Sequence, residues 1–299
     1  MGANKLKKFK NKKISIALVL LIAVIPFFTT AEDTDSDMLV HLKGLRMSTD
    51  FAESPEQDGR IREMEVEALS IGTIAGSYYA SKKINELLDK RASYLDVTFD
   101  FHDSVISYKG AYILPPVISE RKNDTEIVGG KTFTVKRQVY SMETSPRFVY
   151  EVPTWRNYLL LTPVKPQQPD NSLLPRSKDE VALWEKNIEK GWSTGVRQAI
   201  YVVNGRYAKL TRDLVGLDRY HLLVAAKIVS EPVIKHSYTP VSGGGYEMSI
   251  EDSVVEIQVN PLLNTDRFNW QSIPRLPDVS GLFPRGIFSE TDLEIANDE

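Results

Sequence analysis

Apolar residues recur every three or four positions in two stretches of the chain. The first runs from about Arg60 to Arg91 without a proline, and its spacing predicts one long helix. The second opens with the capping-box pair Ser177 and Glu180 and continues for about ten turns, which predicts either one very long helix or two joined at a glycine. In the first stretch Gly72 and Gly76 lie four residues apart, a spacing that lets another backbone pack closely.

Shorter stretches alternate apolar and polar residues and predict strands. YLDVTFDF, Tyr94–Phe101, is predicted to be a strand, and TEIVGGKTFTVKRQVY is predicted to be two strands joined at its Gly-Gly pair. After Pro232, VIKHSY, YEMSI and SVVEIQV predict a second hairpin. The paired prolines of ILPPVI predict that this segment is an edge strand or a rigid packing segment. Thr154 is expected to cap a short helix in PTWRNYLLL.

The predicted fold class is α+β, with long helices packed on antiparallel β-hairpins. We expect the α+β domain to span residues 59–274. Residues 32–58 are rich in Asp, Glu and Ser and are predicted to be a flexible acidic leader, with one short element around Met38 to Leu45. Residues 275–299 are broken by prolines and are predicted to be a flexible tail.

The N-terminus has the charge pattern of an export signal. MGANKLKKFKNKK carries six lysines and no acidic residue, and the apolar run that follows, Ile14 to Phe28, has 15 residues. A helix that spans a membrane needs ~20 residues, whereas 15 suits a signal peptide. We therefore expect residues 1–31 to be a signal peptide cleaved between Ala31 and Glu32. The alternative is an uncleaved helix that tethers the protein to the inner membrane.

Removal of residues 1–31 leaves 31 basic and 40 acidic residues, a net charge of about −9. Nucleic-acid backbones and anionic lipids attract clustered Lys and Arg, so no direct nucleic-acid binding is expected. The sequence contains no cysteine, which excludes disulfides, thiol nucleophiles and lipid attachment through a cysteine within these residues.

No arrangement of residues indicates catalysis. His41, His102, His221 and His236 are scattered without metal-ligand spacing, and neither a phosphate-binding loop nor a Gly-x-Ser-x-Gly motif occurs. We predict no catalytic residue, metal site or cofactor. An exported hydrolase with an unfamiliar site is the least favoured alternative.

Several aromatic and apolar residues are candidates for contact with a partner, although each is also compatible with a core position or a solvated tail. They are Tyr78, Tyr79 and Trp155 in the domain, and Leu282, Phe283, Ile287 and Phe288 in the tail.

Five segments, in order, carry a resemblance to a known family. They are ASKKINELLDKRASYLDVTFDF, ILPPVI, PTWRNYLL, LLPRSKDEVALWEKNIEKGW and GYEMSIEDSVVEIQV. The block that contains Trp155, Pro175, Trp184 and Trp192 is the most specific part. From about Glu65 to Pro274 the chain resembles the DotC family of type IVB (Dot/Icm) secretion systems and its relatives in IncI-type conjugation systems.

The resemblance implies a non-enzymatic periplasmic subunit of the outer-membrane core complex. Its implied partners are a DotD-like lipoprotein, a secretin-like DotH protein and other core-complex subunits, in a ring of like or unlike copies. Family members are lipoproteins whose signal ends in a cysteine, whereas this chain reads FFTTAED at that place. We therefore expect outer-membrane association through protein contacts in the ring rather than through a lipid.

Overall fold

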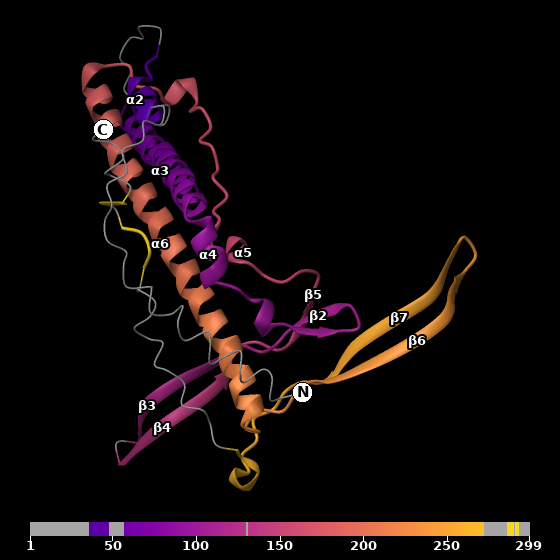
Figure 1. The fold of residues 1–299 in the computed structure, drawn as a ribbon. Coiled ribbons are helices and arrows are strands. Elements are labelled where there is room, and N and C mark those ends of the chain that lie inside the picture. Colours follow the sequence, from indigo (N-terminus) through magenta and orange to yellow (C-terminus); the bar gives the residue numbers. More distant parts are fainter. Residues whose placement is uncertain (1–35, 48–56, 130, 272–285, 290, 293–299) are drawn as a thin grey trace. The chain divides into compact units, whose positions relative to one another are not determined.

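The computed structural model describes residues 36–47, 57–129, 131–271, 286–289 and 291–292 (Figure 1). These residues form two compact units. We call residues 36–47, 57–95, 156–208, 286–289 and 291–292 the helix unit, and residues 96–129, 131–155 and 209–271 the hairpin unit. The predicted α+β class is confirmed by long helices combined with antiparallel hairpins.

Two long helices dominate the helix unit (Figure 1). α3 spans Gln57–Lys90, and α6 spans Lys178–Ala225 as one uninterrupted helix of 48 residues, of which those up to Ala208 belong to this unit. Both helical predictions are confirmed. The remaining elements of the unit are α2 (Ser36–Gly44), most of α4 (Ala92–Thr98), all but the first residue of α5 (Trp155–Leu159) and the 3₁₀ turn η4 (Asn171–Leu173).

Glycines bring the backbones of α3 and α6 together. A Cβ atom on Gly76 would lie 2.2 Å from the carbonyl oxygen of Trp192, and one on Gly195 would lie 2.1 Å from that of Thr73. Gly72 and Gly191 are equally close to the facing backbone, at 2.5 and 2.4 Å. Contacts advance in the same direction along both helices, so α3 and α6 run parallel.

Around this contact lies the core of the helix unit. Trp184 and Met64 are fully buried there. The other buried members of the cluster are Leu42, Ala68, Ile71, Ala75, Leu174 and Ile188. Burial of this apolar surface on α2, α3, η4 and α6 stabilises the unit.

The hairpin unit contains three small antiparallel sheets. One has the strand order β1-β2-β5, formed by Ile106–Tyr108, Ala111–Leu114 and Arg147–Val149; the other two are the hairpins β3–β4, Ile118–Val128 with Thr132–Met142, and β6–β7, Val233–Gly244 with Glu247–Val259. The 3₁₀ turns are η3 (His102–Ser104) and η5 (Arg267–Asn269). Both predicted hairpins are confirmed, with EMSI of YEMSI and all of SVVEIQV on the single strand β7.

The end of α6 forms the core of the hairpin unit with the base of β3. The buried cluster consists of Ile118, Tyr220, Leu223, Ala226, Ile228 and Val229. Gly216 permits the approach, since a Cβ there would lie 2.4 Å from Cγ1 of Val117. Arg219 donates to the carbonyl oxygen of Ile118 at 2.6 Å and lies 3.6 Å from the Glu120 carboxylate. The base of β3–β4 is therefore fixed, whereas its outer part extends beyond this cluster.

The predicted strand at Tyr94–Phe101 is wrong, because residues 92–98 form the helix α4. Leu95 and Phe99, four positions apart, are both buried, whereas Val97, which a strand would place with them, is 72% exposed. A spacing of four places side chains on one helical face. The apolar residues of this eight-residue segment fit both the two-residue period of a strand and the four-residue spacing of a helix. Packing against the rest of the unit decides between them.

Of the two alternatives for ILPPVI, the edge position is wrong for the first two residues, whereas a packing segment agrees with the burial of all of residues 113–118. Ile113 and Leu114 lie on β2, the middle strand of its sheet, and are buried. Pro115 and Pro116 come directly after this strand, so the missing proline N–H groups interrupt no ladder. The prolines instead link β2 to β3.

Parts of the predicted flexible leader and tail are ordered. Residues 36–44 form α2, whose Leu42 is buried, so the expected short element is confirmed and this part of the leader is not flexible. In the tail, Phe288 is 7% exposed, and Asn204 of α6 accepts from the N–H of Ile287 and donates to the carbonyl oxygen of Phe288. Residues 32–35 and 48–56 of the leader, and residues 275–285, 290 and 293–299 of the tail, lie outside the described residues.

The glycine contact leads to a prediction about stability. We expect Gly195→Ala to lower the free energy of unfolding by about 1–3 kcal/mol, because the new methyl group would overlap the carbonyl oxygen of Thr73. Gly205→Ala is the control on the same helix, where a Cβ meets no atom within 4 Å. It should raise stability by about 0.5–1 kcal/mol. Urea denaturation of both variants measures these changes, and equal effects would contradict the close contact.

Candidate interaction surfaces

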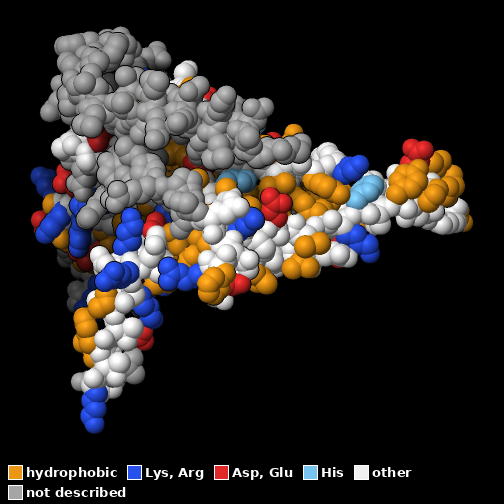
Figure 2. Space-filling model, turned by 60° about the horizontal axis from the view of Figure 1, so that its bottom comes forward, with side chains coloured by type: hydrophobic (Ala, Val, Ile, Leu, Met, Phe, Trp, Pro, Cys, Tyr) orange, Lys and Arg blue, Asp and Glu red, His pale blue; other side chains and the backbone are white. Residues whose placement is uncertain are grey.

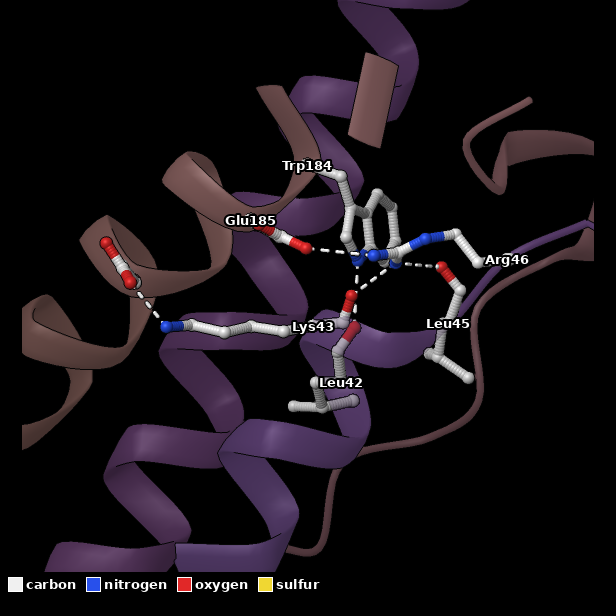
Figure 3. A network of polar contacts seen from close by, with 7 residues as sticks. Leu42, Lys43, Leu45, Arg46, Trp184 and Glu185 are labelled. Atoms are coloured by element: carbon white, nitrogen blue, oxygen red, sulfur yellow. Dashed lines mark hydrogen bonds and ion pairs between the residues drawn. The ribbon is translucent and has the colours of Figure 1, made fainter. Parts of the chain in front are cut away.

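The first described helix, α2, is attached to α6 by the network shown in Figure 3. The indole N–H of the fully buried Trp184 donates to the carbonyl oxygen of Leu42 at 2.8 Å. Arg46 donates to the carbonyl oxygens of Lys43 and Leu45 and lies 2.8 Å from Glu185 of α6. Such donors satisfy the carbonyls that a helix leaves without partners at its C-terminus. The described residues nearest the N-terminus are thus held on α6.

A buried ion pair joins the first turns of α3 and α6. The carboxylate of Glu180 accepts from the guanidinium of Arg60 and, at 2.8 Å, from the backbone N–H of Arg176. Ser177 accepts from the N–H of Glu180 at 3.3 Å, the capping contact that the sequence predicts. Burial by itself raises the pKa of Glu180, but the bonds from Arg60 and Arg176 outweigh it and hold the pKa below 4.5.

The hairpin β3–β4 has one apolar face and one charged face. Ile127 lies opposite Phe133, and Thr125 lies opposite Val135, so the apolar side chains share a face. Ile127 is 68%, Phe133 66% and Val135 50% exposed. The other face carries the ion pair of Glu126 with Lys136, at 2.8 Å. Hydrogen bonding from Lys136 lowers the pKa of Glu126, so this face remains charged in water.

The hairpin β6–β7 also exposes apolar side chains. Val241 lies opposite Ile250, and Met248 lies two positions before Ile250 on the same strand. These side chains are between 58% and 65% exposed. Figure 2 shows hydrophobic side chains gathered along both hairpins, with Lys and Arg at the outer end of β3–β4 and Asp and Glu at the outer end of β6–β7.

The predicted contact residues lie in different environments. Tyr79 is 4% exposed, and its ring lies 5.2 Å from that of Trp192, whereas Tyr78 is half-buried. Trp155 is fully buried and donates to Asp96 at 2.7 Å. Ile287 and Phe288 are held by Asn204 as described above, and Leu282, Phe283, Ala31 and Glu32 lie outside the described residues. Their contact with a partner stays a prediction.

The exposed faces of the hairpins were missed by sequence reasoning. The alternation of Phe133 and Val135 with polar residues is visible in the sequence, but the same alternation is typical of strands with one buried face. Only the structure shows that nothing among the described residues covers this face.

The described part of the chain contains no cluster of three or more His, Cys, Asp or Glu residues that could hold a metal ion. His221 contacts the carbonyl oxygen of Ser104, and His236 contacts the hydroxyl of Ser253, each at 2.9 Å. Among the same residues, no helix is both long and apolar enough to cross a membrane.

The model of one protein family matches residues 58–272, which include both long helices and both hairpins. Its description is "Type IV secretory system, conjugal DNA-protein transfer". The chain belongs to this family. A comparison with curated proteins found no match. The expected relationship to type IV secretion and conjugation is therefore confirmed, whereas the narrower assignment to the DotC family stays a prediction.

The buried Glu180 predicts a dependence of stability on pH. Its pKa is lower in the folded chain than in the unfolded chain, so its contribution is complete above pH ~4.5 and is lost as pH falls through the lower folded value. Glu180→Gln should remove this part of the acid sensitivity. At pH 7 it should cost about 3 kcal/mol, because the largely buried Arg60, whose side chain is 18% exposed, loses its counter-charge.

The matched control is Glu189→Gln, since the side chain of Glu189 is 59% exposed in its ion pair with Lys43. It should change stability by less than about 1 kcal/mol. Urea titrations of both variants between pH 3 and 7 provide the measurement. The same acid-induced loss in Glu180→Gln as in the unaltered chain would refute the assignment.

The bond from Trp184 to Leu42 predicts a local effect. Trp184→Phe should cost about 1–3 kcal/mol, because the carbonyl oxygen loses its donor in a dry environment. Amide hydrogen exchange of α2 should become faster, whereas that of β6–β7 should not change. Trp192→Phe is the control, since the Trp192 indole has no hydrogen bond to a described residue; α2 exchange as fast in this control would contradict the prediction.

Proposed function

We propose that the protein is a non-enzymatic structural subunit of the outer-membrane core complex of a type IVB secretion or conjugation system, of the DotC type. In this role it helps to place and stabilise a secretin-like partner. The observation that carries the proposal is the exposed apolar surface of two hairpins on a chain that belongs to a type IV secretion family.

The energetics of the hairpins support a role in binding. A two-stranded hairpin is only marginally stable by itself in water. β3–β4 nevertheless extends to Val128, far beyond the cluster around Ile118 that fixes its base. Its apolar face gains stability when another surface covers it, and contiguous exposed apolar surface marks interaction sites.

The buried charges support a structural rather than a catalytic role. Among the described residues, Glu180 and Asp213 are the buried acidic side chains. Glu180 is paired with Arg60, and Asp213 is paired with Lys209 and Arg212. These ion pairs satisfy the acids within or between helices, so the carboxylates stabilise the scaffold.

We further propose that contacts within an assembled ring retain the protein at the outer membrane. The expected partners are a DotD-like lipoprotein and a DotH-like secretin-like protein. Several weak contacts in a ring raise the effective concentration of each subunit for its neighbours, so retention does not require a lipid on every subunit.

Envelope fractionation in the native host tests this function. Deletion of the gene should abolish conjugal transfer, and the protein should fractionate with the outer membrane only while its DotD- and DotH-like partners are present. Intact mass should show a chain that begins at Glu32 without lipid. A chain that retains Met1 in the inner membrane, whether or not the partners are present, would favour the tethered scaffold instead.

The apolar face gives a more specific prediction. Phe133→Asp should reduce both transfer and outer-membrane fractionation by at least ~10-fold, because a buried charge in an interface costs several kcal/mol. Its effect on folding should stay within about 0.5 kcal/mol, since the side chain is 66% exposed. Val164→Asp, at a position that is 69% exposed in the connector before η4, is the control and should retain transfer.

A further inference from the structure

The two hairpins carry opposite net charges. Residues 118–142, which form β3–β4, contain five basic and three acidic residues, a net charge of +2. Residues 233–259, which form β6–β7, contain one basic and four acidic residues, a net charge of −3 with histidine neutral. Each hairpin thus combines exposed apolar side chains with an excess of one sign of charge.

On β3–β4 the excess charge borders the apolar face. Arg137 lies two positions from Val135 on the same strand, so the two side chains share a face. Lys131 lies at the turn, next to the cross-strand neighbours Ile127 and Phe133. Neither Lys131 nor Arg137 forms an ion pair with a described residue, unlike Lys136 on the opposite face. Two cations therefore border the apolar face.

On β6–β7 the corresponding positions are acidic. Glu256 lies two positions from Val254 on β7, so these two side chains share a face. Glu247 begins β7 beside the turn. Lys235 is the cross-strand neighbour of Glu256. Neither Glu247 nor Glu256 forms an ion pair with a described residue, and the hairpin keeps its net charge of −3 for a basic partner.

We propose that the β3–β4 hairpin of one copy of this chain binds the β6–β7 hairpin of a second copy, apolar face against apolar face, with the basic residues of the first beside the acidic residues of the second. The apolar side chains supply affinity by leaving water. The charges select the partner, because like hairpins repel and unlike hairpins attract.

The geometry of such a contact determines the kind of assembly. Because two different surfaces of the chain meet, the contact is heterologous. An open assembly therefore keeps one free hairpin of each kind, one at either end. Repeated addition leads to a closed ring, of which a reciprocal two-fold dimer is the smallest, or to an open filament. The inference rests on the proposed structural role, for which it names the contact between copies.

A charge exchange in the purified full-length chain tests the contact. One variant carries Lys131→Glu and Arg137→Glu, and the other carries Glu247→Lys and Glu256→Lys. Each variant alone presents two hairpins of like charge, so its self-association should be at least ~10-fold weaker than that of the unaltered chain. An equimolar mixture restores opposite charges at every contact and should associate again. Analytical ultracentrifugation over a concentration series measures all four samples.

The control variant carries Lys165→Glu and Lys190→Glu, which reverse two exposed charges in the helix unit outside both hairpins. It should associate like the unaltered chain. Circular dichroism and thermal unfolding of every variant establish that the chains are folded before association is compared.

Each remaining outcome overturns the inference. An unaltered chain that stays monomeric, variants that associate as well as the unaltered chain, or a mixture that does not recover would each show that the two hairpins do not bind one another. Failure of the proposed function has a different signature, because the protein would then associate with itself as expected while its deletion leaves conjugal transfer unchanged.

Discussion

The close contact between α3 and α6 is the constraint on which the rest of the helix unit depends. Gly72 and Gly76 on one helix face Gly191 and Gly195 on the other, so the two backbones touch where side chains usually separate them. This approach places Trp184 where its ring is fully buried and its N–H reaches α2. The attachment of α2 to α6 thus depends on the backbone contact between α3 and α6.

The parallel direction of the two helices also explains the organisation of the chain. Parallel neighbours need a long connection, and the residues between α3 and α6 provide it. Asn85 fixes the return of this connection, since its side chain bonds both the N–H and the carbonyl oxygen of Leu161. The connection contains β3–β4, whose outer part no described core residue covers. The same segment therefore links the two parallel helices and carries an exposed apolar face.

The sequence predicted the elements whose pattern is long and repetitive, and it failed where the pattern is short or depends on other layers. α6 was predictable because its apolar stripe continues for many turns, whereas α4 was not, since Leu95 and Phe99 fit two periods equally well over so few residues. For Trp155 the sequence left both a core position and a partner contact open, and the side chain is fully buried. The exposure of Phe133 was not predicted, because it depends on whether another element packs against that face of the strand.

The parallel pair has a consequence for how the chain folds. Gly72 meets Gly191, and Thr73 meets Gly195, across more than a hundred intervening residues. Contacts of such sequence separation form late, because the chain entropy of the whole loop must be lost first. During synthesis this core cannot close until Gly195 has left the ribosome. Any chaperone or export machinery that binds the chain earlier therefore meets α3 with its glycine face still open to solvent.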